Sequence, residues 1–258
     1  MLRLTVLILT KNEASQIRDC LQSVRFADEL LVIDSRSMDA TVAIAREHAT
    51  RIIETDWLGF SATKALGLKE ATGDWILWLD ADERVTPELE REIGTLLLST
   101  SVAGYYLARK TFFLGRWIKH CGWYPGYTLR LFRREAGQFS DDLVHESVRV
   151  TGPTAFLTQP LIHYTDPTLD HYFDKLNHYT TLAARQLYRS GRRFRLTDLL
   201  MRPIFTWVKM YVVKRGFLDG MQGLILCTLS AAYVFTKYAK LWHVWRQAAD
   251  GTETHTSG

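Results

Sequence analysis

The sequence predicts an α/β fold, with a doubly wound, mostly parallel sheet followed by a C-terminal helical extension. Two observations predict it. The first half of the chain alternates short apolar runs with helical patterns in the order βαβαβαβ, and the last third has helical patterns. Parallel strands joined in this way have right-handed crossovers, and ligands bind beyond the carboxyl ends of such strands.

Four strands are expected in the first half. Residues 4–9 form a continuous apolar run, which is typical of a strand buried on both faces. The other three strands are expected at residues 30–33, 51–54 and 75–79. Asp34 and Asp80 fall at the carboxyl ends of two of these strands, and this position alone is a reason to look for a site there.

Helical patterns separate these strands at residues 13–24, 38–49 and 61–71. Ser37 is placed to cap the second of these helices. The run Thr86-Pro87-Glu88 supplies a cap, a proline at the first helical position and an acid in the first turn, so it predicts a further helix start.

The rest of the chain changes character twice. Strands are expected at residues 105–108, 127–132 and 146–150, between loops rich in Gly, Pro and Trp. From Thr168 onward the pattern is helical, with helices expected at residues 168–190, 196–214 and 217–246.

Composition argues against a disordered or disulfide-dense protein. Hydrophobic residues make up 47% and charged residues 23%, and the net charge of +4 suits anionic partners such as nucleotide phosphates or acidic lipid. Three widely spaced cysteines, Cys20, Cys121 and Cys227, favour a reducing cytoplasm over a disulfide framework or a zinc cluster. The first ten residues lack the apolar length and cleavage site of a signal peptide, so we interpret them as the first core strand.

A strand that ends in acids is the strongest chemical signal. Asp80 and Asp82 are separated by one residue, and Glu83 follows directly. Such close carboxylates are costly to bury unless a cation neutralises them, and carboxylates with open positions suit Mn²⁺ or Mg²⁺ completed by substrate phosphates. The alternative is that Asp80 and Asp82 only cap the next turn.

Four motifs in order resemble the nucleotide-binding half of family 2 glycosyltransferases of the GT-A fold. They are VLILTKNE at residues 6–13, LVIDSRSMD at residues 31–39, Lys64 ahead of ATGDW at residues 71–75, and Asp80-Ala-Asp82. The resemblance covers about the first hundred residues.

The resemblance implies a set of donor-binding and metal-binding residues. Thr10 and Asp34 would contact the nucleotide base, with Glu13 in the same donor-binding motif. Lys64 would lie near the base or diphosphate, Asp80 near the ribose and the metal, and Asp82 would ligate the metal. A carboxylate can accept the imide N–H of uracil, which favours a uridine donor. For Asp34 a turn or helix cap stays as the alternative, and for Asp39 a first-turn helix acid is the preferred interpretation.

A second cluster supplies candidates for the general base that an inverting transfer needs. Asp141, Asp142 and Glu146 are the carboxylates, and we favour Glu146, then Asp142, because Leu143-Val144 should draw the following residues toward the sheet. His145 is a candidate metal ligand or phosphate donor, and an ordinary surface or core histidine is the alternative.

Basic and aromatic residues precede that cluster. Arg130 and Arg133, beside Arg134, are candidate ligands of the donor diphosphate or of an anionic acceptor, and alternation places the first two on opposite faces of a strand. Solvated strand charges are the alternative. The aromatic residues Trp117, Trp123, Tyr124 and Tyr127 can stack on sugars, although core packing is their commoner use.

The same stretch narrows the resemblance to a subgroup. The runs WLGF at residues 57–60 and WYPGYTLRLFR at residues 123–133, with Val144-His145-Glu146, look like lipopolysaccharide core β-1,4-glucosyltransferases over nearly the whole chain. That subgroup implies UDP-glucose as donor and an inner-core heptose on a lipid A precursor as acceptor. We therefore expect a GT-A domain at residues 1–165, with a nucleotide-sugar half at 1–100 and an acceptor half at 101–165, a helical extension at 166–248 and a disordered tail at 249–258.

The helical extension has the composition of an interfacial anchor. Basic residues, Trp and Tyr lie beside apolar helices, so we expect a peripheral location on the inner, cytoplasmic face of the cell membrane with anionic lipid as a partner. The longest uncharged run, residues 221–236, is shorter than the roughly 20 residues of a span, so a span is disfavoured. Ordinary packing against the sheet is the alternative.

Two other functions fit the pattern less well. A nucleotidyltransferase needs a glycine-rich phosphate loop after the first strand, and Thr10-Lys-Asn-Glu13 has no glycine. A non-catalytic nucleotide-sugar-binding protein would not need the acid pair and the candidate bases. The expected partners are a UDP-sugar donor, a lipid-linked saccharide acceptor and the membrane surface, with no nucleic acid among them.

Overall fold

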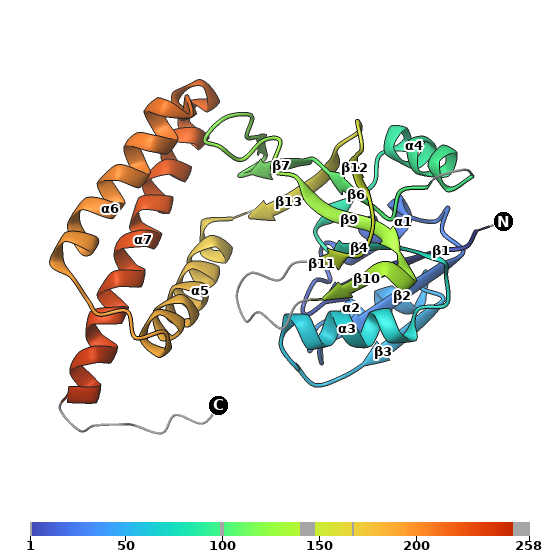
Figure 1. The fold of residues 1–258 in the computed structure, drawn as a ribbon, viewed down its shortest axis with the longest axis horizontal. Helices are drawn as coiled ribbons and strands as arrows, with labels where there is room; N and C mark the ends of the chain where they lie inside the picture. Colours follow the sequence, from blue (N-terminus) through green and yellow to red (C-terminus); the bar gives the residue numbers. More distant parts are fainter. Residues whose placement is uncertain (1, 99–100, 140–147, 167, 250–258) are drawn as a thin grey trace. The chain divides into compact units, whose positions relative to one another are not determined.

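The computed structural model describes residues 2–98, 101–139, 148–166 and 168–249 (Figure 1). The chain forms two compact units. The first comprises Met1–Thr111 and Pro125–Thr165, and the second comprises Phe112–Tyr124 and Asp166–Gly258. The second unit thus takes in a segment from the middle of the chain besides the expected helical extension.

A seven-stranded mixed sheet forms the centre of the first unit, with strand order β12-β6-β9-β4-β1-β2-β3. Its strands are β1 (Leu4–Thr10), β2 (Glu29–Asp34), β3 (Arg51–Glu54), β4 (Trp75–Asp80), β6 (Gly104–Leu107), β9 (Thr128–Arg133) and β12 (Thr154–Phe156). The pairs β1–β2, β1–β4, β2–β3 and β12–β6 are parallel, whereas β9 runs antiparallel to both β4 and β6. The expected α/β fold with a mostly parallel sheet is confirmed.

This topology brings several chain ends to one edge of the sheet. Thr10 pairs with Asp34, and Leu9 pairs with Asp80, so β1, β2 and β4 end side by side. Because β9 is antiparallel to β4, its first residue, Thr128, lies toward that same edge. This edge is where ligands bind in open α/β sheets.

Two hydrophobic clusters cover the two faces of the sheet. On one face pack α1 (Ile17–Ser23), α2 (Thr41–Arg46) and α4 (Pro87–Leu97). On the other pack α3 (Phe60–Glu70) and the hairpin of β10 (Gly137–Phe139) and β11 (Val148–Val150). A short 3₁₀ turn, η1 (Arg134–Ala136), joins β9 to β10.

A second, four-stranded sheet has the order β5-β13-β7-β8. Its strands are β5 (Glu83–Arg84), β13 (Leu161–Asp166), β7 (Arg109–Phe113) and β8 (Arg116–Trp117). The chain passes between the two units within β7 and near the end of β13. The pairing of β13 with β5 places His163 opposite Glu83, directly after the acids that end β4.

The second unit is mostly helical. It contains α5 (Leu169–Arg189), α6 (Leu196–Val208), a π-helical turn η2 (Lys209–Val213), a 3₁₀ turn η3 (Gly216–Asp219) and α7 (Gly220–Ala249). One cluster joins Ala184 of α5 to Tyr238 and Leu241 of α7, and another surrounds the thiols of Cys121 and Cys227, which lie 3.6 Å apart. The three predicted helices are confirmed, with a π-helical turn in place of the end of the second.

Three details of the sequence prediction are wrong. The helix expected from Glu13 begins at Ile17, because the carbonyl of Glu13 accepts from Gln16 and Ile17 in a preceding turn. Ser37 does not cap the next helix, because its hydroxyl donates to Asp34, and α2 begins at Thr41. Six strands were not predicted: β5, β7, β8, β10, β12 and β13. Most have only two or three residues, whereas β13 pairs with β5, a segment far away in the sequence.

A buried carboxylate joins the first two strands to the loop before β4. Glu29, 3% exposed, accepts from the Thr5 hydroxyl at 2.6 Å and from the amide and hydroxyl of Thr72 at 2.8 and 2.9 Å. Burial opposes ionisation of Glu29, but these hydrogen bonds and the charge of Arg51 outweigh it, so the pKa of its carboxyl lies below its ordinary value.

We expect Glu29→Gln to destabilise the protein by about 1–3 kcal/mol at neutral pH, because charge-assisted hydrogen bonds to a buried acceptor are lost. A lowered pKa in the folded state stabilises the fold above the pKa of the unfolded chain, and this contribution is lost as the pH falls through about 4.3 and below. Denaturant titrations at several pH values should therefore show the difference between wild type and variant shrinking in acid. A difference that stays constant across that range would contradict the assigned role.

Candidate functional site

The loops after β1 and β2 are held together by polar contacts. Asp34 is fully buried and its two carboxylate oxygens accept from the amide and hydroxyl of Ser37 at 2.8 and 2.5 Å. The hydroxyl of Ser37 accepts from the amide of Asn12 at 2.8 Å, and the amide oxygen of Asn12 accepts from Met38 at 2.8 Å. Asp34 thus has the turn-capping contacts that the sequence left open as an alternative.

The other residues of these two loops have equally defined places. The buried hydroxyl of Thr10, beside Asp34, has no hydrogen-bond partner among the described residues. The backbone amide of Glu13 donates to the Thr41 hydroxyl at 2.8 Å. Asp39 accepts from the amides of Ala14 and Thr41, but it is not the first-turn helix acid that was expected, because α2 begins at Thr41 and has no acid in its first turn.

Three acids follow the end of β4, and each has a different environment. The side chain of Asp80 is 41% exposed, that of Asp82 is 14% exposed and that of Glu83 is fully buried. Glu83 folds back so that its carboxylate accepts from the backbone amide of Asp80 at 3.0 Å. The turn therefore presents Asp80 to solvent while Glu83 supports it from inside.

Arg130 of β9 balances part of this negative charge. Its side chain is 1% exposed, and its Nη2 atom donates to Asp80 at 2.9 Å and to Glu83 at 2.5 Å. The register of β6 with β9 passes from Leu131 to Leu129, so Arg130 is the extra residue of a β-bulge. Its side chain lies on the face of Trp78 and reaches the acidic turn.

Trp78 supports two cations near the same turn. The Nζ atom of Lys64 lies 4.0 Å from the centroid of its indole ring, and the Cζ atom of Arg130 lies 3.5 Å from it. The indole N–H donates to the carbonyl of Leu129 at 2.9 Å, which fixes the ring against β9. Lys64 is 5% exposed, and its charge acts on Asp80.

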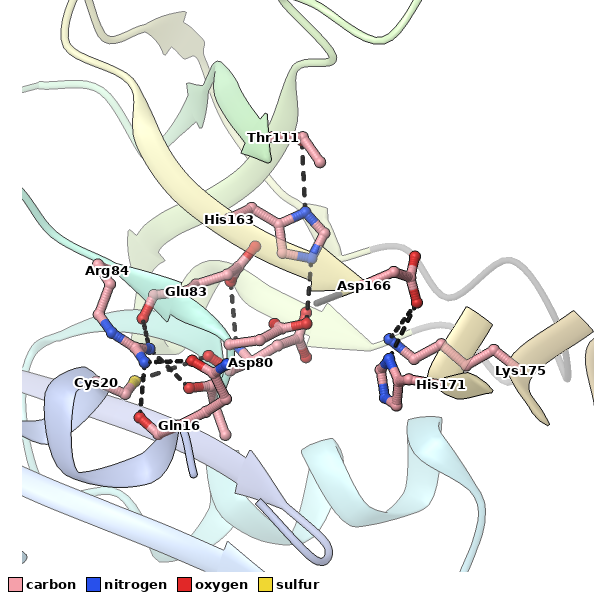
Figure 2. Close-up of polar contacts among 12 residues, drawn as sticks. Gln16, Cys20, Asp80, Glu83, Arg84, Thr111, His163, Asp166, His171 and Lys175 are labelled. Atoms are coloured by element: carbon pink, nitrogen blue, oxygen red, sulfur yellow. Dashed lines mark hydrogen bonds and ion pairs between the residues drawn. The ribbon is translucent and has the colours of Figure 1, made fainter. Parts of the chain in front are cut away.

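His163 approaches the acids from β13. Its Nε2 atom lies 3.4 Å from Oδ2 of Asp82, and its Nδ1 atom lies 3.5 Å from the hydroxyl of Thr111. Figure 2 shows His163 between Thr111 and the acidic turn. The backbone amide of Tyr164 also donates to the carbonyl of Asp82 at 2.9 Å. The strand β13 therefore contacts both the side chain and the backbone of Asp82.

Arg84 locks the turn to the start of α1. Its guanidinium donates to the carbonyls of Ala81 and Glu83, both at 2.8 Å, and to the backbone and side-chain oxygens of Gln16, both at 2.7 Å (Figure 2). With four acceptors satisfied, Arg84 is a structural cation that keeps the loop after β4 in place.

The charges of the cluster shift the protonation of its members. Burial opposes ionisation of Asp80, but the charges of Arg130 and Lys64 outweigh it and hold the pKa of Asp80 well below its usual range. Burial, with the negative charges of Asp80 and Asp82, raises the pKa of Glu83. Burial also opposes protonation of His163, but the hydrogen bond and charge of Asp82 outweigh it, so the pKa of His163 is raised.

The acidic turn fits a divalent cation held jointly with a ligand. Oδ1 of Asp82 is buried without a hydrogen-bond partner in the part of the chain that the structure describes, and Asp80 next to it is open to solvent. No group of three or more His, Cys, Asp or Glu side chains among the described residues is arranged to hold a metal by itself. Two carboxylates with the remaining positions left to phosphate oxygens and water is an arrangement that suits Mg²⁺ or Mn²⁺.

The structure separates some of the residues that the sequence suggested together. Arg133 pairs with Trp75 at the start of β4, the opposite end of that strand from Asp80, and its guanidinium lies 5.0 Å from the Trp75 ring. The candidate bases Asp142 and Glu146, with Asp141 and His145, lie outside the described residues. Thr10, Asp34, Lys64, Asp80, Asp82 and Arg130 do gather at one edge of the sheet.

Sequence reasoning missed Trp78, Glu83 as the buried partner of Arg130, Arg84 and His163. Trp78 precedes Asp80 by two residues, so strand alternation could have placed both side chains on one face. His163 gives no comparable signal, because its position depends on the antiparallel pairing of β13 with β5 across about eighty residues.

Comparisons with known proteins identify a family and several relatives. The family model described as Glycosyl transferase family 2 matches residues 5–149. An uncharacterized glycosyltransferase of Rickettsia felis is 28% identical, over 93% of this chain and 89% of its own length. The lipopolysaccharide core biosynthesis glycosyltransferase LpsC of Rhizobium meliloti is 27% identical, over 92% of this chain and 94% of its own length.

Among solved structures, the mannosyltransferase PcManGT from Pyrobaculum calidifontis, in complex with GDP-Man and Mn²⁺, is similar in fold. Its TM-score is 0.55 at 16% identity, covering 95% of this chain and 88% of the other. The match supports the GT-A fold that the sequence motifs predict.

We expect Arg130→Met to lower the free energy of unfolding by about 3–5 kcal/mol, because it leaves Glu83 buried without its counter-charge. The double variant Arg130→Met/Glu83→Gln should recover part of this loss. Denaturant titration measures both, with Arg133→Met as the matched control at the other end of β4. Equal losses for Arg130→Met and Arg133→Met would contradict the balance of charge described above.

Proposed function

The chain belongs to glycosyltransferase family 2 and is a glycosyltransferase, and we propose that it is an inverting enzyme that transfers glucose from UDP-glucose to a lipid-linked glycan of the lipopolysaccharide inner core, with Mn²⁺ or Mg²⁺ as cofactor. The observation that carries the proposal is the acidic turn after β4. There Asp80 is open to solvent, and a buried oxygen of Asp82 has no partner among the described residues.

The donor half of the site would hold the nucleotide. Asp34 and Thr10 adjoin at the ends of β2 and β1, and each carboxylate oxygen of Asp34 can accept a further hydrogen bond beyond that from Ser37, such as one from the imide of uracil. Lys64 brings a positive charge between this pair and the acidic turn, where a diphosphate would lie. Asp80 and Asp82 would hold the cation, which stabilises the negative charge of the diphosphate as it leaves.

Inversion requires one displacement at the anomeric carbon of the sugar. A hydroxyl oxygen of the acceptor forms the new bond to that carbon, the bond to the diphosphate oxygen breaks, and UDP departs on the opposite face. The hydroxyl proton passes to a carboxylate acting as general base, which we assign to Glu146 with Asp142 as the alternative.

Two observations support the choice of substrates. LpsC, a relative along nearly the whole chain, is described as a lipopolysaccharide core biosynthesis glycosyltransferase. The sequence motifs resemble the glucosyltransferases of that pathway, which implies UDP-glucose as donor and an inner-core heptose as acceptor.

The Mn²⁺ bound with GDP-Man in PcManGT, which has a similar fold, is consistent with a divalent cation in the same role here.

We expect Asp82→Asn to lower the rate of UDP release from UDP-glucose by at least about a hundredfold, because the cation would contribute several kcal/mol to the transition state. The measurement is a hydrolysis screen over nucleotide sugars with and without Mn²⁺, and chelation with EDTA should have a similar effect. Asp19→Asn, an exposed acid on α1, is the control and should keep full activity.

The outcomes of this screen separate the alternatives. Preference for another nucleotide sugar would retain the glycosyltransferase and overturn the choice of glucose. Full activity of a folded Asp82→Asn protein would overturn the role of the metal. Formation of a nucleotide sugar from a nucleoside triphosphate and a sugar phosphate would instead indicate that the protein is a nucleotidyltransferase.

We further propose that the second unit attaches the enzyme to the inner face of the cell membrane through α6 and the turns that follow it. Side chains between Leu196 and Met221 form an apolar surface in which each member is at least 42% exposed: Leu196, Leu200, Met201, Ile204, Phe205, Val208, Val212, Val213, Phe217, Leu218 and Met221. An exposed apolar surface of this extent on one helical segment indicates an interaction site.

The charges around this surface favour an anionic bilayer as the partner. Exposed cations border it: Arg193, Arg195, Arg202, Lys209, Lys214 and Arg215. The two acids of the same segment, Asp198 and Asp219, are 8% and 2% exposed. Asp198 is paired with Arg192 and Arg202, and Asp219 accepts from the amides of Lys119 and His120. Each basic residue near an anionic leaflet contributes about 1 kcal/mol of attraction.

The contacts of α7 favour a peripheral attachment over a span. Among the described residues, the helical stretch Gly216–Ala249 is long and apolar enough, by length and composition, to cross a bilayer. However, Lys240 of α7 donates to the carbonyl and side chain of Asn177 and to the hydroxyl of Thr181 on α5, each at 2.7 Å. Tyr238 and Leu241 are buried in a cluster with Ala184 of α5, so the C-terminal half of α7 is tied to that helix.

We expect Phe205→Glu and Val213→Glu, each replacing a side chain that is 67% exposed, to weaken binding to vesicles containing phosphatidylglycerol by at least about tenfold. Leu98→Glu, at a 76% exposed position of the first unit, is the matched control and should bind like wild type. Sedimentation with vesicles measures the binding, and raised salt should weaken it. Unchanged binding by both variants would contradict the α6 surface, and retention on membranes through carbonate extraction would indicate a span instead.

A further inference from the structure

Three aromatic rings form an exposed cluster on the first unit. The ring of Phe156 on β12 stacks on Tyr106 of β6 with centroids 5.2 Å apart, and meets the ring of Tyr127 edge-on at 4.7 Å. Phe156 is 60% exposed and Tyr127 is 47% exposed, whereas Tyr106 packs partly into the core beneath them. Two large, exposed rings held in place by a third form a rigid apolar platform.

This platform lies near the acidic turn. Tyr127 comes directly before β9, whose residues Leu129 and Arg130 bind Trp78 and Asp80. The carbonyl of Pro125 accepts from the amide of Arg109 at 2.8 Å, and the side chain of Arg109 donates to the carbonyl of Gly126 at 3.5 Å, so β7 holds the segment before Tyr127. The strands β6 and β12 run parallel to β4, so Tyr106 and Phe156 lie toward the ends of strands that finish at the same edge of the sheet as Asp80.

The strand order places this platform on the side of β4 away from the nucleotide. Thr10 and Asp34 belong to β1 and β2, on one side of β4, whereas the aromatic rings belong to β6, β12 and the start of β9, on the other side. We propose that the Tyr106–Tyr127–Phe156 platform binds a sugar ring of the acceptor glycan, next to the sugar that receives the transfer or on that sugar itself. The inference rests on the proposed transferase function and adds to it the place where the acceptor binds.

The chemistry of the rings fits a saccharide. One face of a pyranose ring presents C–H groups, which pack against an aromatic face, while its hydroxyls stay in water or bind polar groups. The Tyr127 hydroxyl offers such a polar group beside the apolar surface. A hydrocarbon chain would gain no more from an aromatic ring than from an aliphatic side chain, so aromatic and aliphatic substitutions distinguish the two ligands.

The test uses a deacylated, heptose-containing inner-core oligosaccharide as the probe. We expect Phe156→Ala and Tyr127→Ala to raise its KM, and its Kd by calorimetry, about five- to tenfold, as expected for loss of an aromatic contact. Phe156→Trp should bind like wild type and Phe156→Leu like Phe156→Ala. Leu98→Ala, at another exposed position of the same unit, is the control. UDP release from UDP-glucose without the oligosaccharide should be unchanged in all variants.

Other outcomes would overturn the inference. Normal oligosaccharide binding by Phe156→Ala and Tyr127→Ala would remove the platform from the acceptor site. Full binding by Phe156→Leu would show that ring stacking is not required, and weaker UDP binding by Phe156→Ala would assign the rings to the nucleobase. If the wild-type protein released no UDP from any nucleotide sugar, the proposed transferase itself would fail, and this result is distinguishable from a loss that appears only with the oligosaccharide.

Discussion

The placement of Arg130 against the acids that follow β4 is the interaction on which the site depends. A fully buried Glu83 would be costly without a counter-charge, and Arg130 supplies one charge to both Glu83 and Asp80. Alternation along β9 places Arg130 on the same face of the sheet as Phe132 and Trp78, and Arg130 is also the extra residue of the bulge in this strand. Arg130 contacts Asp80 and Glu83 but leaves one buried oxygen of Asp82 without a partner among the described residues, so the turn can still ligate a cation with Arg130 in place.

The same contacts explain why Asp80 and Asp82 differ although they are two residues apart. Asp80 is kept ionised and exposed by Arg130 and Lys64, whereas Asp82 is drawn inward toward His163 and leaves one buried oxygen without a partner in the described part of the chain. The first arrangement suits a group that meets a mobile ligand, and the second suits a group held rigid around an ion. Two chemically identical side chains in the loop at the end of β4 are thus suited to different roles because their surroundings differ.

Sequence patterns predicted those features that depend only on residues close together in the sequence. The buried run of β1, the acids that end β4 and the cap at Thr86, whose hydroxyl accepts from Leu89, follow from residues close in sequence. The role of His163 and the inward turn of Arg130 depend instead on antiparallel pairings between distant segments, which periodicity does not report. The capping role expected of Ser37 failed for a related reason, because Asp34 competes for its hydroxyl.

In the helical unit, too, the sequence does not show the surface that matters, because composition alone does not tell which apolar residues are exposed. The longest uncharged run, residues 221–236, belongs to α7, where Gly223, Leu226 and Cys227 are buried, and the same helix is bonded to α5 further on through Lys240. The apolar side chains left to solvent gather on α6, where Arg202 and Pro203 interrupt any uncharged run and hide the surface from a composition scan. Which apolar residues can meet a membrane is therefore decided by what the neighbouring helices have already covered, so an interfacial surface is recognised from packing and not from hydropathy.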